Sequence, residues 1–204
     1  MSVDLYISKF VHLKANTVFV NGKAVLTAAD QLTFNEFAKQ VYKQKALSYP
    51  KFFKMDGLSK LAFLGASFLF EEAVPPSNTA IILTNNASSL ATDRKHQASI
   101  DTADNYFPSP AVFVYTLPNI AIGEISIKYG LQSENAFFIF DRFNTAVLSQ
   151  YTAALLHQDK SEAVLCGWVE FDGASYEAFM YVVNTTGGRA HTENELEKLY
   201  KIID

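Results

Sequence analysis

The chain has 204 residues, 49% of them hydrophobic and 19% charged, which is the composition of a folded domain and excludes a disordered segment. A net charge of −4 gives no electrostatic reason to expect nucleic acid as a partner, and no run of Lys and Arg suggests a membrane anchor. The apolar runs are too short to cross a bilayer, and one cysteine, Cys166, excludes an intramolecular disulfide or a cysteine metal cluster. The N-terminus lacks the apolar core of a secretory signal. We therefore expect a single domain over residues 1–204, in the cytoplasm, with no metal and no cofactor.

The chain begins with a predicted strand and hairpin. Leu5–Leu13 alternates between apolar and polar residues as a strand does. Thr17–Val20 and Lys23–Val25 are joined by Asn21 and Gly22, a pair that tolerates the positive φ angles of a two-residue turn. We expect these segments to form neighbouring strands.

Two capped helices and a buried strand follow. Thr33 is the predicted cap of a helix that runs to about Leu47, and Asp56 that of a second helix, which ends before Pro75. Thr79–Thr84 is short and wholly apolar or small, which indicates a buried strand. The polar loop after it is typical of the carboxyl edge of an α/β sheet.

The middle of the chain predicts a polar segment and then a helix. Leu90–Asp104 is expected to add an exposed helical turn or two, and a rigid proline turn follows at Asn105–Pro110. Ile120–Tyr129 is predicted to be helical, with Gly130 closing it in the left-handed conformation.

A strand, a tight elbow and a helix come next, and the chain is organised around them. Asn135–Phe140 is an apolar run of strand length, and Thr145–Leu156 has apolar or small residues on nearly every helical face. Between them, Phe140, Asp141 and Arg142 form the predicted elbow. In several α/β enzymes such an elbow presents a nucleophilic Ser or Cys at the start of the helix. Here neither residue is present.

The C-terminal part predicts two strands and a helix. The strands are Glu162–Val169 and Tyr176–Val183. Thr192 with Glu195 three residues later forms a predicted capping box for a helix that ends near Ile203.

The order of these motifs resembles the N-terminal half of the β-ketoacyl synthases, the condensing enzymes of fatty-acid and polyketide synthesis, over about residues 1–183. The matching residues are Met55-Asp56 with Ser59, Leu61 and Ala62, Ile81-Ile82-Leu83, Pro108 and Pro110, Leu117-Pro118-Asn119, Gly123 with Ile125-Ser126, and Tyr129-Gly130-Leu131. The resemblance implies an α/β chain with half of a thiolase-like fold. Its sheet would be mixed, mainly parallel, of about five strands, with helices on both faces.

This sequence departs from the family at its reactive centre. The resemblance places the family's nucleophilic cysteine at Phe140, Asp141 or Arg142, none of which can form a thioester. Cys166 lies within a predicted strand, where a cysteine is usually an inert small hydrophobe. The C-terminal half that supplies the family's histidines is absent, and the four histidines here do not follow the family's pattern: His12, His96, His157 and His191.

The resemblance therefore implies a non-catalytic subunit, similar to the chain-length factors that pair with an active ketosynthase and shape its acyl channel. Short chains of this kind resemble those of aryl-polyene and flexirubin-type pathways. The helix Thr145–Leu156 would need a cover on its far side, either the hairpin or last helix of this chain or, as we favour, a second polypeptide. Family members dimerise through the strand before the elbow. Candidate residues for the interface or the acyl channel are Asn135, Phe137, Phe138, Phe140 and Phe143.

Two alternatives remain open at this point. One is a homodimeric module that binds an acyl group or an acyl carrier protein, although the absence of an obvious Lys/Arg cluster disfavours docking of an acidic carrier. The other is a thioesterase-like hydrolase that uses Asp141 with His157. A helix of that length would hold these two residues about 20 Å apart, which disfavours the pair.

Overall fold

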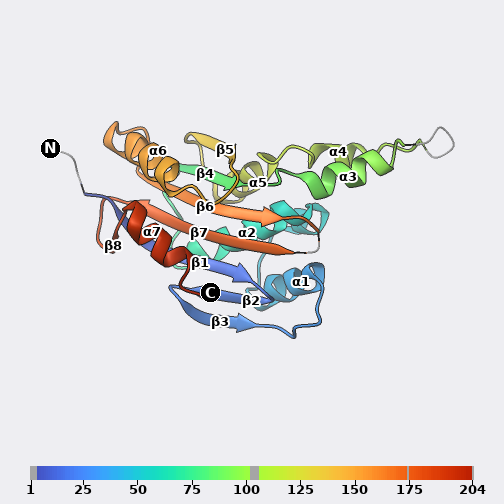
Figure 1. The fold of residues 1–204 in the computed structure, drawn as a ribbon, viewed down its shortest axis with the longest axis horizontal. Helices are drawn as coiled ribbons and strands as arrows, with labels where there is room; N and C mark the ends of the chain where they lie inside the picture. The colour runs from blue at the N-terminus through green and yellow to red at the C-terminus, as the bar shows by residue number, and fades with distance from the viewer. Residues whose placement is uncertain (1–3, 102–105, 174, 204) are drawn as a thin grey trace.

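The computed structural model of the protein describes residues 4–101, 106–173 and 175–203. Within these residues eight strands form one sheet in the order β3-β2-β1-β7-β6-β4-β5, with β8 added beside β1 (Figure 1). The strands are β1 (Tyr6–Lys14), β2 (Thr17–Val20), β3 (Lys23–Thr27), β4 (Thr79–Asn85), β5 (Asn135–Ile139), β6 (Ala163–Phe171), β7 (Tyr176–Asn184) and β8 (Arg189–Ala190). The fold class is therefore α/β, as the sequence predicts.

The sheet is mixed, but the expectation of a mainly parallel sheet of about five strands is wrong. Only the β4–β5 and β4–β6 pairs are parallel, and each joins strands that are separated by helices in the sequence. The β1–β2, β2–β3 and β6–β7 pairs are antiparallel because short turns connect these strands and reverse the chain. The predicted hairpin turn is present, with φ of 50° at Asn21 and 79° at Gly22.

Helices cover both faces of the sheet and divide the core in two. The described helices are α1 (Phe34–Gln44), η1 (Pro50–Lys54), α2 (Gly57–Leu69), α3 (Leu90–Ala98), α4 (Pro110–Val114), α5 (Ile120–Tyr129), α6 (Thr145–His157) and α7 (Glu193–Tyr200). The larger core packs α1, α2 and α5 against one face. The smaller core packs α6 and α7 against the other. None of the helices in the described part of the chain is long and apolar enough to cross a membrane.

The residues predicted to cap helix N-termini do so in the structure. Thr33 forms a reciprocal capping box with Glu36, and the Asp56 side chain accepts a hydrogen bond from the Ser59 N–H. Thr192 caps α7 by accepting from the Glu195 N–H.

The second half of the predicted box at α7 has another partner. The Glu195 carboxylate lies 3.0 Å from the guanidinium of Arg189. The helix also ends at Tyr200, before the predicted limit at Ile203. The predicted polar segment 90–104 forms α3, and its residues 102–104 lie outside the described residues, as does Asn105 of the predicted proline turn.

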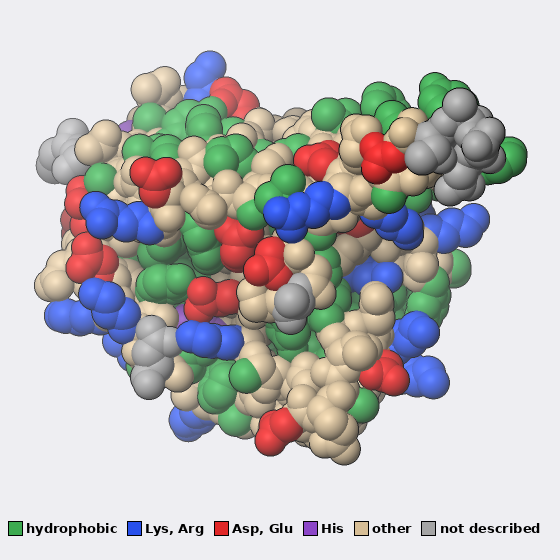
Figure 2. All heavy atoms as spheres, turned by 45° about the vertical axis from the view of Figure 1, so that its right-hand side comes forward, with side chains coloured by type: hydrophobic (Ala, Val, Ile, Leu, Met, Phe, Trp, Pro, Cys, Tyr) green, Lys and Arg blue, Asp and Glu red, His purple; other side chains and the backbone are tan. Residues whose placement is uncertain are grey.

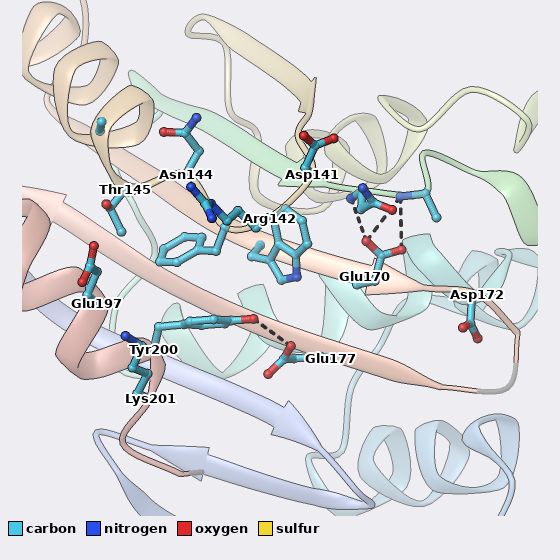
Figure 3. Close-up of a pocket in the computed structure, with 15 residues that line it drawn as sticks. Asp141, Arg142, Asn144, Thr145, Glu170, Asp172, Glu177, Glu197, Tyr200 and Lys201 are labelled. Carbon is cyan, nitrogen blue, oxygen red and sulfur yellow. Dashed lines mark hydrogen bonds between the residues drawn. The ribbon is translucent and has the colours of Figure 1, made fainter.

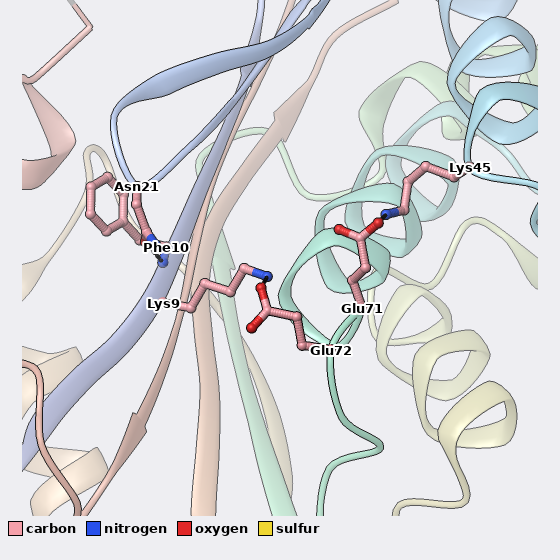
Figure 4. Close-up of polar contacts among 6 residues, drawn as sticks. All are labelled: Lys9, Phe10, Asn21, Lys45, Glu71 and Glu72. Carbon is pink, nitrogen blue, oxygen red and sulfur yellow. Dashed lines mark hydrogen bonds and ion pairs between the residues drawn. The ribbon is translucent and has the colours of Figure 1, made fainter.

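Two ion pairs fasten the segment after α2 to the rest of the molecule (Figure 4). The ammonium of Lys9, on β1, lies 2.9 Å from the Glu72 carboxylate, and that of Lys45, at the end of α1, lies 2.8 Å from Glu71. The Asn21 side chain accepts a hydrogen bond from the Phe10 N–H at 3.0 Å and so holds the hairpin turn against β1.

Candidate functional site

The elbow after β5 is fixed to the end of the neighbouring strand β4. The Phe140 N–H donates to the Asn85 carbonyl at 2.9 Å, and the Asn86 side-chain amide donates to the Phe140 carbonyl at 3.2 Å. Asn144 caps the following helix by accepting from the Val147 N–H at 3.1 Å. Because β4 and β5 are parallel, their carboxyl ends meet at one edge, the usual position of a ligand site in an α/β sheet.

Glu170 ties the loop after β4 to strand β6. Its carboxylate accepts hydrogen bonds from the backbone N–H groups of Asn86, at 2.7 Å, and Ala87, at 3.3 Å (Figure 3). These charge-assisted bonds hold the loop in one position beside the elbow.

A cavity of about 960 Å³ opens beside the elbow, and we call it the elbow cavity. Asp141, Arg142 and the first turn of α6 form one wall, and β6 and β7 form the floor. Glu197, Tyr200 and Lys201, from α7 and its end, enter from the opposite side (Figure 3). Both Asp141 and Arg142 are exposed to solvent.

Helix α7 closes one flank of this cavity through Tyr200. The Tyr200 ring lies 4.7 Å, centroid to centroid, from that of Phe143, which follows the elbow directly. Its hydroxyl donates to the Glu177 carboxylate at 2.9 Å (Figure 3). The expected cover of α6 is therefore supplied in part by this chain's own last helix. The rest of α6 is only partly buried.

The chemistry of the elbow cavity is that of carboxylates. Five line it: Asp141, Glu170, Asp172, Glu177 and Glu197. No Ser, Cys or His is among its described lining residues, so neither a Ser–His nor a Cys–His pair is formed there. Among the residues that the structure describes, no group of three or more His, Cys, Asp or Glu side chains is placed to hold a metal ion.

Cys166 lies outside the cavity, fully buried within β6. Burial raises the pKa of its thiol to about 12, and hydrogen bonds with Thr152 and Tyr181 lower it less. The Thr152 hydroxyl lies 3.1 Å from the sulfur. A thiol with this pKa is not a thiolate at neutral pH, which agrees with the predicted inert role.

The structure does not bring a histidine to the elbow. His157 is the last residue of α6, about 18 Å along the helix from its first turn. His12 is buried in β1, and His96 lies on α3. Burial lowers the pKa of His191, before α7, to about 4. The Asp141–His157 pair that a hydrolase would need is therefore not assembled.

The interface candidates lie on the last strand of the sheet and just beyond it. β5 is the terminal strand, and Asn135 and Ile139 at its ends are exposed. Phe137 packs against the larger core, while Phe138 and Phe143 pack against the smaller one. The Phe140 ring lies 6.0 Å from that of Phe138. These phenylalanines are half-buried, so part of each side chain packs inside the protein and part is exposed to solvent.

An apolar arm extends from one end of the molecule. Figure 1 shows α3 and α4 reaching beyond the end of the sheet at the right of the view, whereas β5 lies at the upper centre and α6 at the upper left. Large apolar side chains are exposed on this arm, namely Phe107, Phe113, Val114 and Leu117.

The structure contains a charged cluster that the sequence does not predict. Lys54, Lys60 and Lys95 line a second cavity, although they lie on η1, α2 and α3 respectively. The expectation of no Lys/Arg cluster is therefore wrong. The first and last of these lysines are 41 positions apart in the sequence, so only the packing of the helices could reveal the cluster.

No protein-family model and no curated protein matches the chain. Several solved structures do match the chain in fold. The ishigamide ketosynthase/chain length factor is 15% identical with a TM-score of 0.67 over 89% of this chain. The chain has a thiolase-like, ketosynthase-type fold. A structure of the ketosynthase ApeO with its chain length factor ApeC, from Xenorhabdus doucetiae, is 15% identical with a TM-score of 0.61 over 97% of this chain.

A third similar structure is the type II acyl carrier protein–ketosynthase complex AntDE:AntF, 11% identical with a TM-score of 0.64 over 96% of this chain. The chain spans 62% of the ishigamide chain and 65% of the AntDE:AntF chain, but 90% of the chain in the ApeO–ApeC complex. These similarities confirm the fold that the motifs implied.

Proposed function

We propose that this chain is a non-catalytic ketosynthase-like subunit of the chain-length-factor type. It pairs in the cytoplasm with an active ketosynthase of fatty-acid or polyketide synthesis, in a pathway of the aryl-polyene kind. One observation carries the proposal. The elbow of a ketosynthase-type fold holds Phe140, Asp141 and Arg142, and the cavity beside it contains no described Ser, Cys or His.

The similar structures support this assignment. Two are described as a ketosynthase with a chain length factor, and a third as a ketosynthase with its acyl carrier protein. A chain of the ApeO–ApeC complex is matched over 90% of its own length, so its size is close to that of this chain.

The free edge of β5 is suited to pairing with a second sheet. The Ile81 N–H donates to the Glu134 carbonyl and the Phe140 N–H to the Asn85 carbonyl, so residues 134 and 140 face β4. Backbone groups alternate in direction along a strand, and the N–H groups of Asn135, Phe137 and Ile139 therefore face away from β4. An edge of this kind is a template for another strand.

Exposed apolar side chains lie on this strand and on the arm. Ile139 is 49% exposed and Phe113, on the arm, is 56% exposed. We infer that a partner chain covers both and that the half-buried rings of Phe138 and Phe140 border the interface or the acyl channel. Covering such surface stabilises a complex by about 25 cal/mol for each Å².

Co-expression tests the proposal. The chain is produced with an active-site-intact ketosynthase encoded beside it, using a tag on one subunit only. We expect a stable complex and a product whose chain length differs from that made by the ketosynthase alone. Failure to co-purify together with an unchanged product length would refute the assignment.

A homodimeric carrier-binding module is the second candidate, and one observation favours it. The lysine cluster on the helical side gives an acidic carrier protein a basic surface that the sequence did not predict. Native mass spectrometry of the purified chain separates the two candidates. A homodimer that persists when the ketosynthase is added would favour this second reading.

A further inference from the structure

A second cavity, of about 320 Å³, lies among α1, η1, α2, α3 and α4. We call it the lysine cavity, after Lys54, Lys60 and Lys95 in its wall. It shares no lining residue with the elbow cavity. Figure 2 shows Lys and Arg side chains gathered on the right of the molecule, below the protruding arm.

The charge of Lys60 is incompletely neutralised. The side chain is half-buried, and its ammonium donates to the neutral Asn35 side-chain oxygen at 3.1 Å. Burial lowers the pKa of Lys60, Asp56 raises it, and the positive charges of Lys39 and Lys95 lower it further. No ion pair to a described residue is formed by any of the three lysines that line the cavity. Positive charge therefore accumulates here.

The one carboxylate among the described lining residues is already engaged. One oxygen of Asp56 accepts from the Ser59 N–H at 2.9 Å, and the other accepts from the Thr92 hydroxyl at 2.8 Å. Three ammonium groups against one carboxylate leave an excess of two positive charges around the cavity.

The inner wall of the lysine cavity is apolar. Met55 and Tyr115 are buried, and Val112 and Phe171 are half-buried. The Tyr115 hydroxyl points to Glu124, to which it donates at 2.9 Å, so the cavity meets its ring surface. A ligand here would meet cations at the rim and hydrocarbon beneath, and the volume lies at the lower end of the usual range for small-molecule sites.

We propose that the lysine cavity binds a phosphate monoester that has an aliphatic body. The phosphate lies among Lys54, Lys60 and Lys95, since three point charges suit a dianion better than a monovalent carboxylate. The aliphatic part lies on Met55, Val112 and Phe171. This site is independent of the elbow and of the β5 edge.

Isothermal titration of the full chain with n-hexyl phosphate tests the proposal, with inorganic phosphate, hexanoate and hexanol as matched probes. We expect hexyl phosphate to bind more tightly than all three and its affinity to fall as salt is added. Lys60→Met keeps the length of the side chain and removes the charge. It should weaken hexyl phosphate binding about tenfold, as expected for the loss of a charge-assisted hydrogen bond. Lys198→Met, on the exposed face of α7, is the matched control and should change nothing.

Lys95 is exposed on α3, so Lys95→Met tests the same charge without disturbing the core if Lys60→Met lowers the melting temperature. Either lysine variant binding hexyl phosphate as the unmodified chain does would overturn the proposal. Equal affinity for hexyl phosphate and hexanol, or for hexyl phosphate and inorganic phosphate, would overturn it as well. Tighter binding of hexanoate than of hexyl phosphate would exclude a phosphate monoester as the ligand.

Discussion

Tyr115 donates a hydrogen bond to Glu124 across 2.9 Å in the interior of the protein. The carboxylate is 2% exposed and also accepts from the Tyr49 hydroxyl at 2.9 Å, while the Lys51 ammonium lies 2.8 Å away. Glu124 thus joins α5 to Lys51 in η1, to Tyr49 directly before η1 and to Tyr115 directly after α4. A buried carboxylate is tolerated here because two hydroxyls and one cation satisfy it.

Glu124→Ala should lower the free energy of unfolding by about 3 kcal/mol, because it leaves the Tyr115 hydroxyl buried without its acceptor. Glu124→Gln keeps the size and one acceptor oxygen, and should lower it by about 1 kcal/mol. Urea unfolding followed by circular dichroism measures both. The exposed Glu193→Gln is the control and should stay within about 0.5 kcal/mol of the unmodified chain. A Glu124→Ala variant as stable as this control would contradict the role of the network.

The same network predicts a loss of stability at high pH. Burial raises the pKa of Tyr49 to about 12, with further contributions from the hydrogen bond to Glu124 and its charge. Burial also raises the pKa of Tyr115 well above its ordinary value. Tyrosine in the unfolded chain loses its proton near pH 10, so deprotonation favours unfolding. The contribution of these two tyrosines to the free energy of unfolding should be constant below about pH 10 and decrease from there to pH 12, and Glu124→Gln should make this decrease less steep. Urea titrations at each pH measure how the free energy of unfolding changes with pH. The same dependence between pH 10 and pH 12 in Glu124→Gln and in the unmodified chain would contradict the prediction.

Cys166 should react with thiol reagents only when the protein unfolds. It is fully buried, and burial raises its pKa to about 12, so the folded chain offers neither access nor thiolate. Because it is the single cysteine, release of the chromophore from Ellman's reagent at pH 8 reports on this thiol alone. We expect negligible release without urea and complete reaction in 8 M urea. Asp141→Cys supplies the contrast, since its thiol at the exposed elbow should react rapidly in the folded state.

The sequence predicted the elements better than it predicted their neighbours. The caps at Thr33, Asp56 and Gly130, the Asn21-Gly22 turn and the elbow were readable because each depends on a few adjacent residues. The proportion of antiparallel strand pairs was not predicted correctly. The family resemblance implies a mainly parallel sheet, whereas the short turns between strands favour antiparallel pairs. The lysine cavity could not be predicted from the sequence, because its three lysines come from three separate helices. Local chemistry is visible in a sequence, whereas clusters made by packing are not.

The proposed pairing through β5 predicts that a charge at its free edge blocks the complex. Ile139 is 49% exposed on β5, and Val25 is 54% exposed on β3, the strand at the opposite edge of the sheet. Ile139→Lys should abolish co-purification with the ketosynthase, because it places an unpaired charge in the apolar contact. Val25→Lys is the matched control and should leave the complex intact. Both variants should keep the melting temperature of the isolated chain, and retention of the complex by Ile139→Lys would exclude this edge as the interface.

Helix α7 should be an integral part of the fold because it packs in the smaller core and contacts α6. Leu196 is fully buried in the smaller core, and Leu199 is 2% exposed there. Leu196→Ala should lower the free energy of unfolding by about 3 kcal/mol, because it opens a cavity between α7 and the sheet. The exposed Lys198→Ala, on the same helix, controls for helix propensity and should cost less than about 0.5 kcal/mol. Tyr200→Phe keeps the ring and removes the hydrogen bond to Glu177, which should cost about 1 kcal/mol. If Leu196→Ala proves neutral in urea unfolding, α7 is a detachable segment, and a partner chain must supply the cover of α6.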